Sequence, residues 1–159
     1  MAPLIVLIVS TLVLRLAGAA GVQPLASWRD ATRVGLAVMF AFTGSTHFTA
    51  MKHDYAAMVP PPLTGQLWVI YVTGILEIAG AIGLLVRTTR RLAGICLSLL
   101  LLALFPANVH AALNAIDFRG EAPTVIWLRS LVQVVFLVAT WWSSVARRHA
   151  VVPRLQPAA

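Results

Sequence analysis

Long apolar blocks, separated by short polar or proline-containing connections, follow one another along the chain. A helix needs about 20 mostly apolar residues to cross a bilayer. Five blocks approach this length, at residues 2–21, 31–50, 66–86, 92–113 and 124–146. Proline and polar loop residues end helices where water returns, and the connections contain both. The pattern predicts an all-α membrane protein built from a bundle of transmembrane helices.

The composition excludes a soluble domain. Of 159 residues, 60% are apolar and 11% are charged, whereas a soluble domain carries about 25% charged residues. The whole chain, residues 1–159, is therefore predicted to be a single transmembrane domain, with residues 147–159 as a short basic cytoplasmic tail. Cys96 is the only cysteine, which excludes a disulfide within the chain and a thiolate metal site. We expect no metal site.

Basic residues are distributed unevenly among the connections. With five crossings, the first and third connections and the tail lie on one side of the membrane, and most arginines lie there: Arg29, Arg33, Arg87, Arg90, Arg91, Arg147, Arg148 and Arg154. The other side has little beyond Lys52 and Arg119. Since basic loops stay cytoplasmic, we predict a multi-pass protein of the inner (plasma) membrane, with its N-terminus outside and its C-terminus in the cytoplasm. The net charge of +7 is then explained by basic residues that orient the protein in the membrane, and no nucleic-acid partner is expected.

The first block is open to two interpretations. A secretory signal peptide has its positive charge before the apolar run, but here Arg15 lies in the C-terminal half of the block. The sequence Ala17-Gly18-Ala19 nevertheless resembles a signal-peptide cleavage site. We expect a retained helix.

Small residues are frequent in the third block, at residues 66–86. Gly74, Gly80 and Gly83 lie along it, together with several alanines. Helices in lipid approach one another closely where side chains are small. We therefore predict that this helix lies at the centre of the bundle.

Polar groups inside the blocks are the functional candidates, because polar groups at membrane depth are costly unless they are paired or face a cavity. Six residues form the candidate polar cavity: His47, Glu77, Asn108, His110, Arg129 and Gln133. The rise of a helix places most of them near the outer ends of their helices and Glu77 near the middle of its own. If their faces converge, they outline a ligand-binding cavity that opens outward.

Each candidate also has a structural interpretation. Glu77 and Arg129 either form an ion pair between helices or serve a ligand or a proton. His47 and His110 are either hydrogen-bonded residues at helix ends or ligands of a bound group. Asn108 follows Pro106, so it either lines a cavity at a kink or caps the backbone group that proline frees. No catalytic residue is assigned.

Several motifs together resemble a known family. They are Phe42-Thr43-Gly44-Ser45-Thr46-His47-Phe48, Met58-Val59-Pro60-Pro61, the glycine-rich stretch Thr73–Leu84, Phe105-Pro106-Ala107-Asn108-Val109-His110 and Trp127–Gln133. In this order the chain resembles the DoxX-like family of small bacterial membrane proteins, from about Ala31 to the end of the last block. The resemblance implies an antiparallel four-helix transmembrane bundle formed by the second to fifth blocks, with the first block as an additional N-terminal helix.

The resemblance also implies a function in redox metabolism. A DoxX-like protein would bind a quinone-like or other small apolar ligand, or couple a partner oxidoreductase to the quinone pool. The absence of a cysteine pair argues against the branch of the family that is linked to disulfide formation. The alternative is a non-catalytic membrane protein for assembly or anchoring, which docks another membrane subunit or a second copy of itself. Whether the protein is an enzyme stays open, and a quinone is the candidate cofactor.

Overall fold

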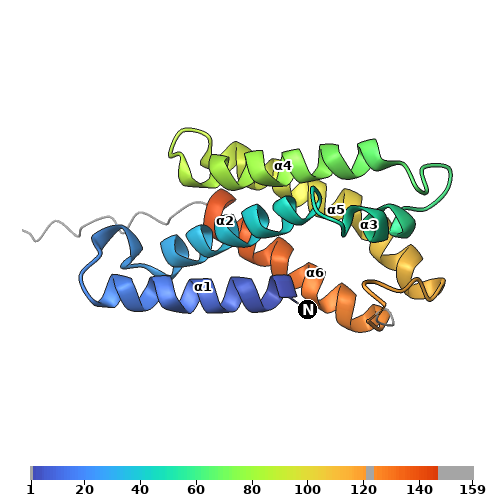
Figure 1. Ribbon diagram of the computed structural model, residues 1–159. Coiled ribbons are helices and arrows are strands. Elements are labelled where there is room, and N and C mark those ends of the chain that lie inside the picture. Colours follow the sequence, from blue (N-terminus) through green and yellow to red (C-terminus); the bar gives the residue numbers. More distant parts are fainter. Residues whose placement is uncertain (1, 121–123, 147–159) are drawn as a thin grey trace, which may run out of the picture.

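The computed structural model describes residues 2–120 and 124–146, and over these residues the chain is all-helical (Figure 1). The helices are α1 (Ala2–Ala19), α2 (Trp28–Thr46), α3 (Lys52–Met58), α4 (Leu67–Leu85), α5 (Arg90–Leu113) and α6 (Ile126–Thr140), with a short 3₁₀ helix η1 (Gln23–Leu25) and a π-helical segment η2 (Trp141–Val145). Consecutive long helices run in alternate directions (Figure 1). This confirms the predicted all-α fold. The predicted basic tail, residues 147–159, lies outside the described residues.

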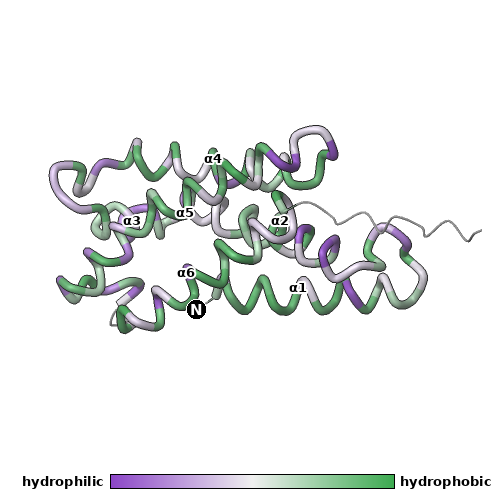
Figure 2. Tube along the Cα trace, turned by 180° about the vertical axis from the view of Figure 1, so that it is seen from behind, coloured by the Kyte–Doolittle hydropathy of each residue, from purple (hydrophilic) through white to green (hydrophobic). Residues whose placement is uncertain are grey.

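Within the described residues, four helices are long and apolar enough to cross a membrane: α1, α4, α5 and the continuous helix Ile126–Val145. Hydrophobic positions follow the helices, and hydrophilic ones gather at the connections at both ends (Figure 2). The predicted block at residues 31–50 corresponds to α2, which has Arg29, Asp30 and Arg33 in its first two turns. It is not among the four apolar helices.

The central helix is α2 rather than α4. It packs against α1, α4, α6 and η2, and its buried positions follow its whole length, from Ala31 to Thr46. The helix predicted to be central, α4, contacts α2, α3 and α5 and lies at one edge of the bundle (Figure 1). The charges of α2 fit this position, because a helix enclosed by other helices has little contact with lipid and need not be apolar on every face.

The short helix α3 follows α2 in the chain, packs against α4 and α5, and was not predicted. Its sequence, Lys52 to Met58, is too short and too polar to form an apolar block. It is held to the bundle by a small apolar cluster in which Ala56 and Val59 pack with Ile70 of α4. The end of the bundle at which α3 lies is called the α3 end below.

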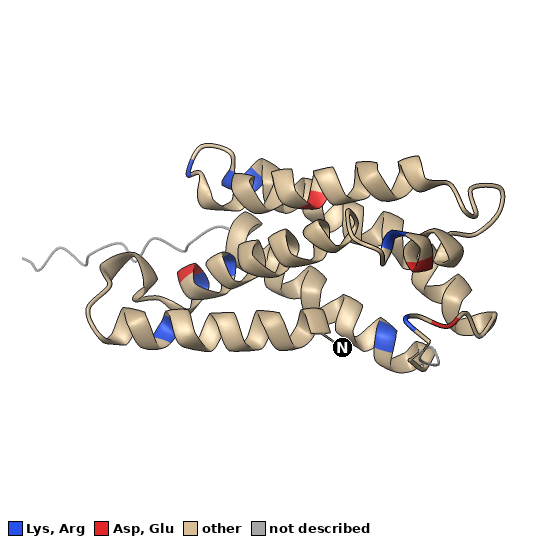
Figure 3. Cartoon of the chain, viewed as in Figure 1, with Lys and Arg blue, Asp and Glu red and all other residues tan. Residues whose placement is uncertain are grey.

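The opposite end is called the arginine end. It contains Arg29 and Arg33 of α2, Arg90 and Arg91 of α5 and the connection with Arg87. Figure 3 shows basic positions at both ends of the bundle and one acidic position within α4. Glu77 is the acidic residue of α4.

Two glycines bring α2 and α4 into backbone contact. A Cβ atom added at Gly44 would lie 2.9 Å from the carbonyl oxygen of Gly74, and one added at Gly74 would lie 2.7 Å from Cβ of His47. Neither position has room for a larger residue. This close crossing sets the last turns of α2, with Thr43 and His47, against Glu77.

Candidate functional site

A cavity of about 430 Å³ opens between the helices toward the α3 end, and α2, α3, α4, α5 and α6 all contribute to its lining. Five of the six candidate residues line it: His47, Glu77, Asn108, Arg129 and Gln133. His110 does not. Its Nδ1 atom lies 3.1 Å from the carbonyl oxygen of Met58, so it joins α5 to α3. For His110 the structure favours the interpretation as a hydrogen-bonded residue near a helix end.

Glu77 forms the acidic wall of the cavity. Its side chain is buried, with 6% exposure, and its Oε2 atom accepts a hydrogen bond of 2.6 Å from the Thr43 hydroxyl. Within the described part of the chain, its other oxygen, Oε1, accepts no hydrogen bond. One oxygen of this carboxylate is thus held in place while the other is left for a group in the cavity.

His47 lies beside Glu77 on the same wall. Its Nδ1 atom is 2.9 Å from the carbonyl oxygen of Thr43. A carbonyl only accepts, so Nδ1 carries the hydrogen and Nε2 keeps a lone pair in the neutral ring. Thr43 thus orients both polar groups of this wall, through its hydroxyl and its carbonyl. Sequence reasoning missed Thr43, although a residue four positions before His47 lies on the same helix face.

An aromatic stack forms the roof of the cavity. The ring of Tyr55 in α3 stacks on that of His47, with centroids 4.6 Å apart and planes at 9°, and the ring of Phe118 is tilted at 48° to that of Tyr55, with centroids 5.1 Å apart. The Tyr55 hydroxyl is 2.9 Å from Oγ1 of Thr46. Burial raises the pKa of Tyr55 above its ordinary value, so the phenol stays neutral at physiological pH. Tyr55 was also missed, since nothing in the apolar pattern marks α3.

Arg129 and Asn108 form the basic wall. Arg129 donates from Nε to the carbonyl oxygen of Thr124 at 3.0 Å and from Nη1 to Oδ1 of Asn108 at 3.2 Å. Among residues 2–120 and 124–146 its guanidinium forms no ion pair with Glu77. Of the two interpretations, the structure does not support the ion pair: Arg129 bonds to the start of α6 and to α5, while Glu77 bonds to α2.

Gln133 satisfies a backbone group beside the proline of α5. Its Nε2 atom donates to the carbonyl oxygen of Leu101 at 2.6 Å. Pro106 lies inside α5 and has no N–H, which leaves the carbonyl of Leu102, four residues earlier, without its helical partner. Gln133 thus bonds to the carbonyl next to the one that proline frees, and within the described residues Asn108, which accepts from Arg129, does not cap the freed group.

The remaining walls are apolar. Met39 and Phe40 of α2, Leu101 of α5 and Phe136 of α6 line the cavity away from the roof. The first turn of α1, residues 2–4, lines another side. The cavity thus combines two polar walls with an apolar lining that suits an amphiphilic molecule.

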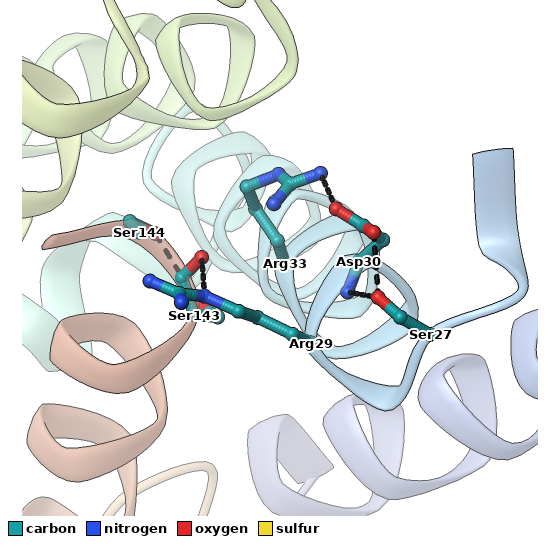
Figure 4. Close-up of polar contacts among 6 residues, drawn as sticks. All are labelled: Ser27, Arg29, Asp30, Arg33, Ser143 and Ser144. Carbon is teal, nitrogen blue, oxygen red and sulfur yellow. Dashed lines mark hydrogen bonds and ion pairs between the residues drawn. The ribbon is translucent and has the colours of Figure 1, made fainter. Parts of the chain in front are cut away.

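At the arginine end, by contrast, polar residues form hydrogen bonds and an ion pair with one another (Figure 4). Ser27 caps α2 by accepting a hydrogen bond from the backbone N–H of Asp30 at 3.0 Å, and Asp30 forms an ion pair of 2.5 Å with the buried Arg33. Arg29 donates from Nε to the carbonyl oxygen of Ser143 at 3.3 Å and from Nη2 to that of Ala146. We call Ser27, Arg29, Asp30, Arg33 and Ser143 the closed polar cluster.

Comparison with known proteins corrects the resemblance drawn from the motifs. No DoxX family is found, and the family that matches, over residues 36–145, is described as a domain of unknown function, DUF8561. The assignment to the DoxX-like family is wrong. Its motifs consist of glycines, prolines and helix-end residues, which serve close packing and helix termination in any small membrane bundle. No curated protein and no solved structure matches the chain. Since the match covers well over half of the sequence, the chain belongs to the DUF8561 family.

Proposed function

We propose that this protein binds a small, lipid-soluble amphiphile in the cavity at the α3 end, with a quinone-like ring compound as the first candidate. The cavity carries this proposal. Its volume of about 430 Å³ lies within the range of small-molecule pockets, which are mostly apolar with a few placed polar groups. Glu77, buried within an apolar helix, has no charged partner in the described residues. A group that costly to bury is expected to serve a ligand or a proton.

Should the ligand be a quinone, the cellular role would be that of a membrane component of redox metabolism, which exchanges electrons with a partner oxidoreductase. The DUF8561 family match adds no support to this role. The proposed location is the inner membrane, with the arginine end toward the cytoplasm, because basic residues stay on that side. A cysteine introduced into the connection between α4 and α5, in a Cys96→Ala background, should react with an impermeant thiol reagent only after the cells are opened. Labelling in intact cells would reverse the orientation.

Ligand binding is tested on the full chain purified in detergent. We expect a benzoquinone with a ten-carbon alkyl tail to raise the unfolding temperature, and lipid extraction of the untreated protein to yield a bound amphiphile. Ala107 lines the cavity and Ala103 is exposed one turn away on α5. Ala107→Phe should abolish the stabilisation by filling the cavity, while Ala103→Phe should preserve it. An empty protein that the probe does not stabilise would contradict the proposal.

The second candidate is a non-catalytic assembly or anchoring protein, whose small-residue helix docks a partner. The small residues of α4 are largely used within the chain: a Cβ at Gly74 would meet His47, one at Gly80 would meet Leu97, and one at Gly83 would meet Ala93. They leave less surface for a partner helix than the sequence alone suggests. A ligand-free protein that copurifies with another membrane subunit, or as an oligomer of itself, would favour this candidate.

A further inference from the structure

Hydrogen-bond acceptors and donors are segregated on the two polar walls of the cavity. The wall formed by α2 and α4 offers two acceptors that have no hydrogen bond in the described residues, Oε1 of Glu77 and Nε2 of His47. Both groups are already oriented by Thr43. With Glu77 ionised and His47 neutral, both atoms can accept a further hydrogen bond, so this wall suits a donor on the ligand.

The opposite wall offers a donor. Arg129 uses Nε and Nη1 for Thr124 and Asn108, and its Nη2 group has no hydrogen bond within the described part of the chain. A guanidinium donates and never accepts. Arg119, which is exposed, also lines the cavity. This side thus suits a carbonyl, an ester or an anion.

We infer that the ligand has a polar head with a hydroxyl or amine donor at one end, placed against Glu77 and His47, and an acceptor or anion at the other, placed against Arg129. The inference rests on the proposed function and names the ligand class. A neutral quinone, with acceptors at both ends, forms hydrogen bonds only with the Arg129 wall, so it should bind but less tightly than its hydroquinone. A hydroquinone or a hydroxybenzoate-type head matches both walls. A cationic amphiphile suits Glu77 but is repelled by the two arginines.

A matched pair of probes tests this polarity: heptyl 4-hydroxybenzoate and heptyl 4-methoxybenzoate. Both have the ring, the ester carbonyl and the apolar tail, but only the first has a donor. Binding of each to the purified full chain is measured by titration calorimetry. We expect the hydroxyl probe to bind about tenfold or more tightly, because the methoxy probe leaves buried acceptors unpaired.

Two variants separate the walls. A glutamine amide both donates and accepts, so Glu77→Gln should bring the affinity ratio of the two probes close to one. Arg129→Gln should weaken both probes alike and keep the ratio, because both carry the ester. Ser98→Ala serves as the control, since Ser98 is buried but lies outside this cavity, bonded to the carbonyl of Gly94.

The outcomes distinguish the inference from the proposed function. If neither probe binds the wild-type protein, the proposed function fails and the inference with it. If both bind with equal affinity, the cavity does hold an amphiphile, but the polarity of its walls is overturned. A ratio that survives Glu77→Gln also overturns it. The comparison within the wild-type protein needs no variant to fold.

Discussion

At the arginine end, the buried guanidinium of Arg33 lies 2.5 Å from the carboxylate of Asp30, whereas at the α3 end the buried carboxylate of Glu77 has the hydroxyl of Thr43 as its partner. Both Arg33 and Glu77 are 6% exposed. The difference lies in what surrounds them. Arg33 belongs to the closed polar cluster, in which side chains satisfy one another and the carbonyls of η2. Glu77 borders a cavity.

This comparison separates charges that hold the fold from charges that are available to a ligand. Removing one partner of a buried ion pair leaves an uncompensated charge and is strongly destabilising. A buried acid without a charged partner adds little to stability, and replacing it by a neutral residue is often tolerated or favourable, as at many functional sites. Burial alone therefore does not distinguish the two classes, but the partners do.

The largest expected effect is the loss of Arg33. Arg33→Met should lower the free energy of unfolding by about 1.5–3 kcal/mol, because it removes the charge-assisted hydrogen bond and ion pair between the buried guanidinium and the partly buried Asp30 carboxylate. Glu77→Gln should change the free energy of unfolding far less, and should raise it slightly. Both are measured by denaturant or thermal unfolding of the purified protein in the same detergent. Equal losses at the two sites would remove the distinction between the two ends.

The next effect concerns the crossing of α2 and α4. Gly74→Ala should cost about 1–3 kcal/mol, because the added methyl group meets Cβ of His47 at 2.7 Å and forces the helices apart. It should also weaken binding of the hydroxyl probe, because Glu77 and His47 then separate. Ile75→Ala is the control, since Ile75 is 57% exposed on the same helix. A Gly74→Ala protein with unchanged stability and affinity would show that the close crossing does not build the site.

The sequence was sufficient to predict the helices, because a long apolar block has few other ways to satisfy its backbone in lipid. It was insufficient for their arrangement. Hydropathy indicates contact with lipid, so α2, which is enclosed by other helices, is the least apolar of the long helices. The glycine-rich α4 was therefore predicted, wrongly, to be the central helix. The short helix α3 carries no block at all, although Tyr55 forms part of the roof.

The candidate site was predicted in outline. Depth along each helix follows from counting residues, and the cost of polar groups in lipid selects them, so five of the six candidates line one cavity. Direction around each helix axis does not follow from one sequence. For this reason an ion pair between Glu77 and Arg129 stayed open as one of two interpretations, while Thr43, the partner that holds Glu77, was overlooked.

A smaller effect is expected in the roof. Tyr55→Phe keeps the stack on His47 but loses the hydrogen bond to Thr46, so it should cost about 0.5–1.5 kcal/mol of stability. Tyr71→Phe is the matched control, because the Tyr71 hydroxyl, also partly buried, accepts a hydrogen bond of 3.1 Å from Lys52 but does not line the cavity. Thermal unfolding of both variants gives the comparison. A greater loss at Tyr71 would mean that the hydrogen bond of the roof contributes no more than one outside the cavity.

The smallest expected effect is the coupling between the two walls of the empty cavity. Glu77 bonds to Thr43, and Arg129 bonds to Thr124 and Asn108, so the two residues share no partner. In a double-mutant cycle with Glu77→Gln and Arg129→Gln, the changes in unfolding free energy should add within about 0.5 kcal/mol. A coupling well above that value would restore the ion pair that the sequence suggested. The same cycle measured on the affinity for heptyl 4-hydroxybenzoate should also be additive, because Glu77 bonds the hydroxyl and Arg129 the ester, at opposite ends of one head, and this is why the ratio of the two probes should survive Arg129→Gln.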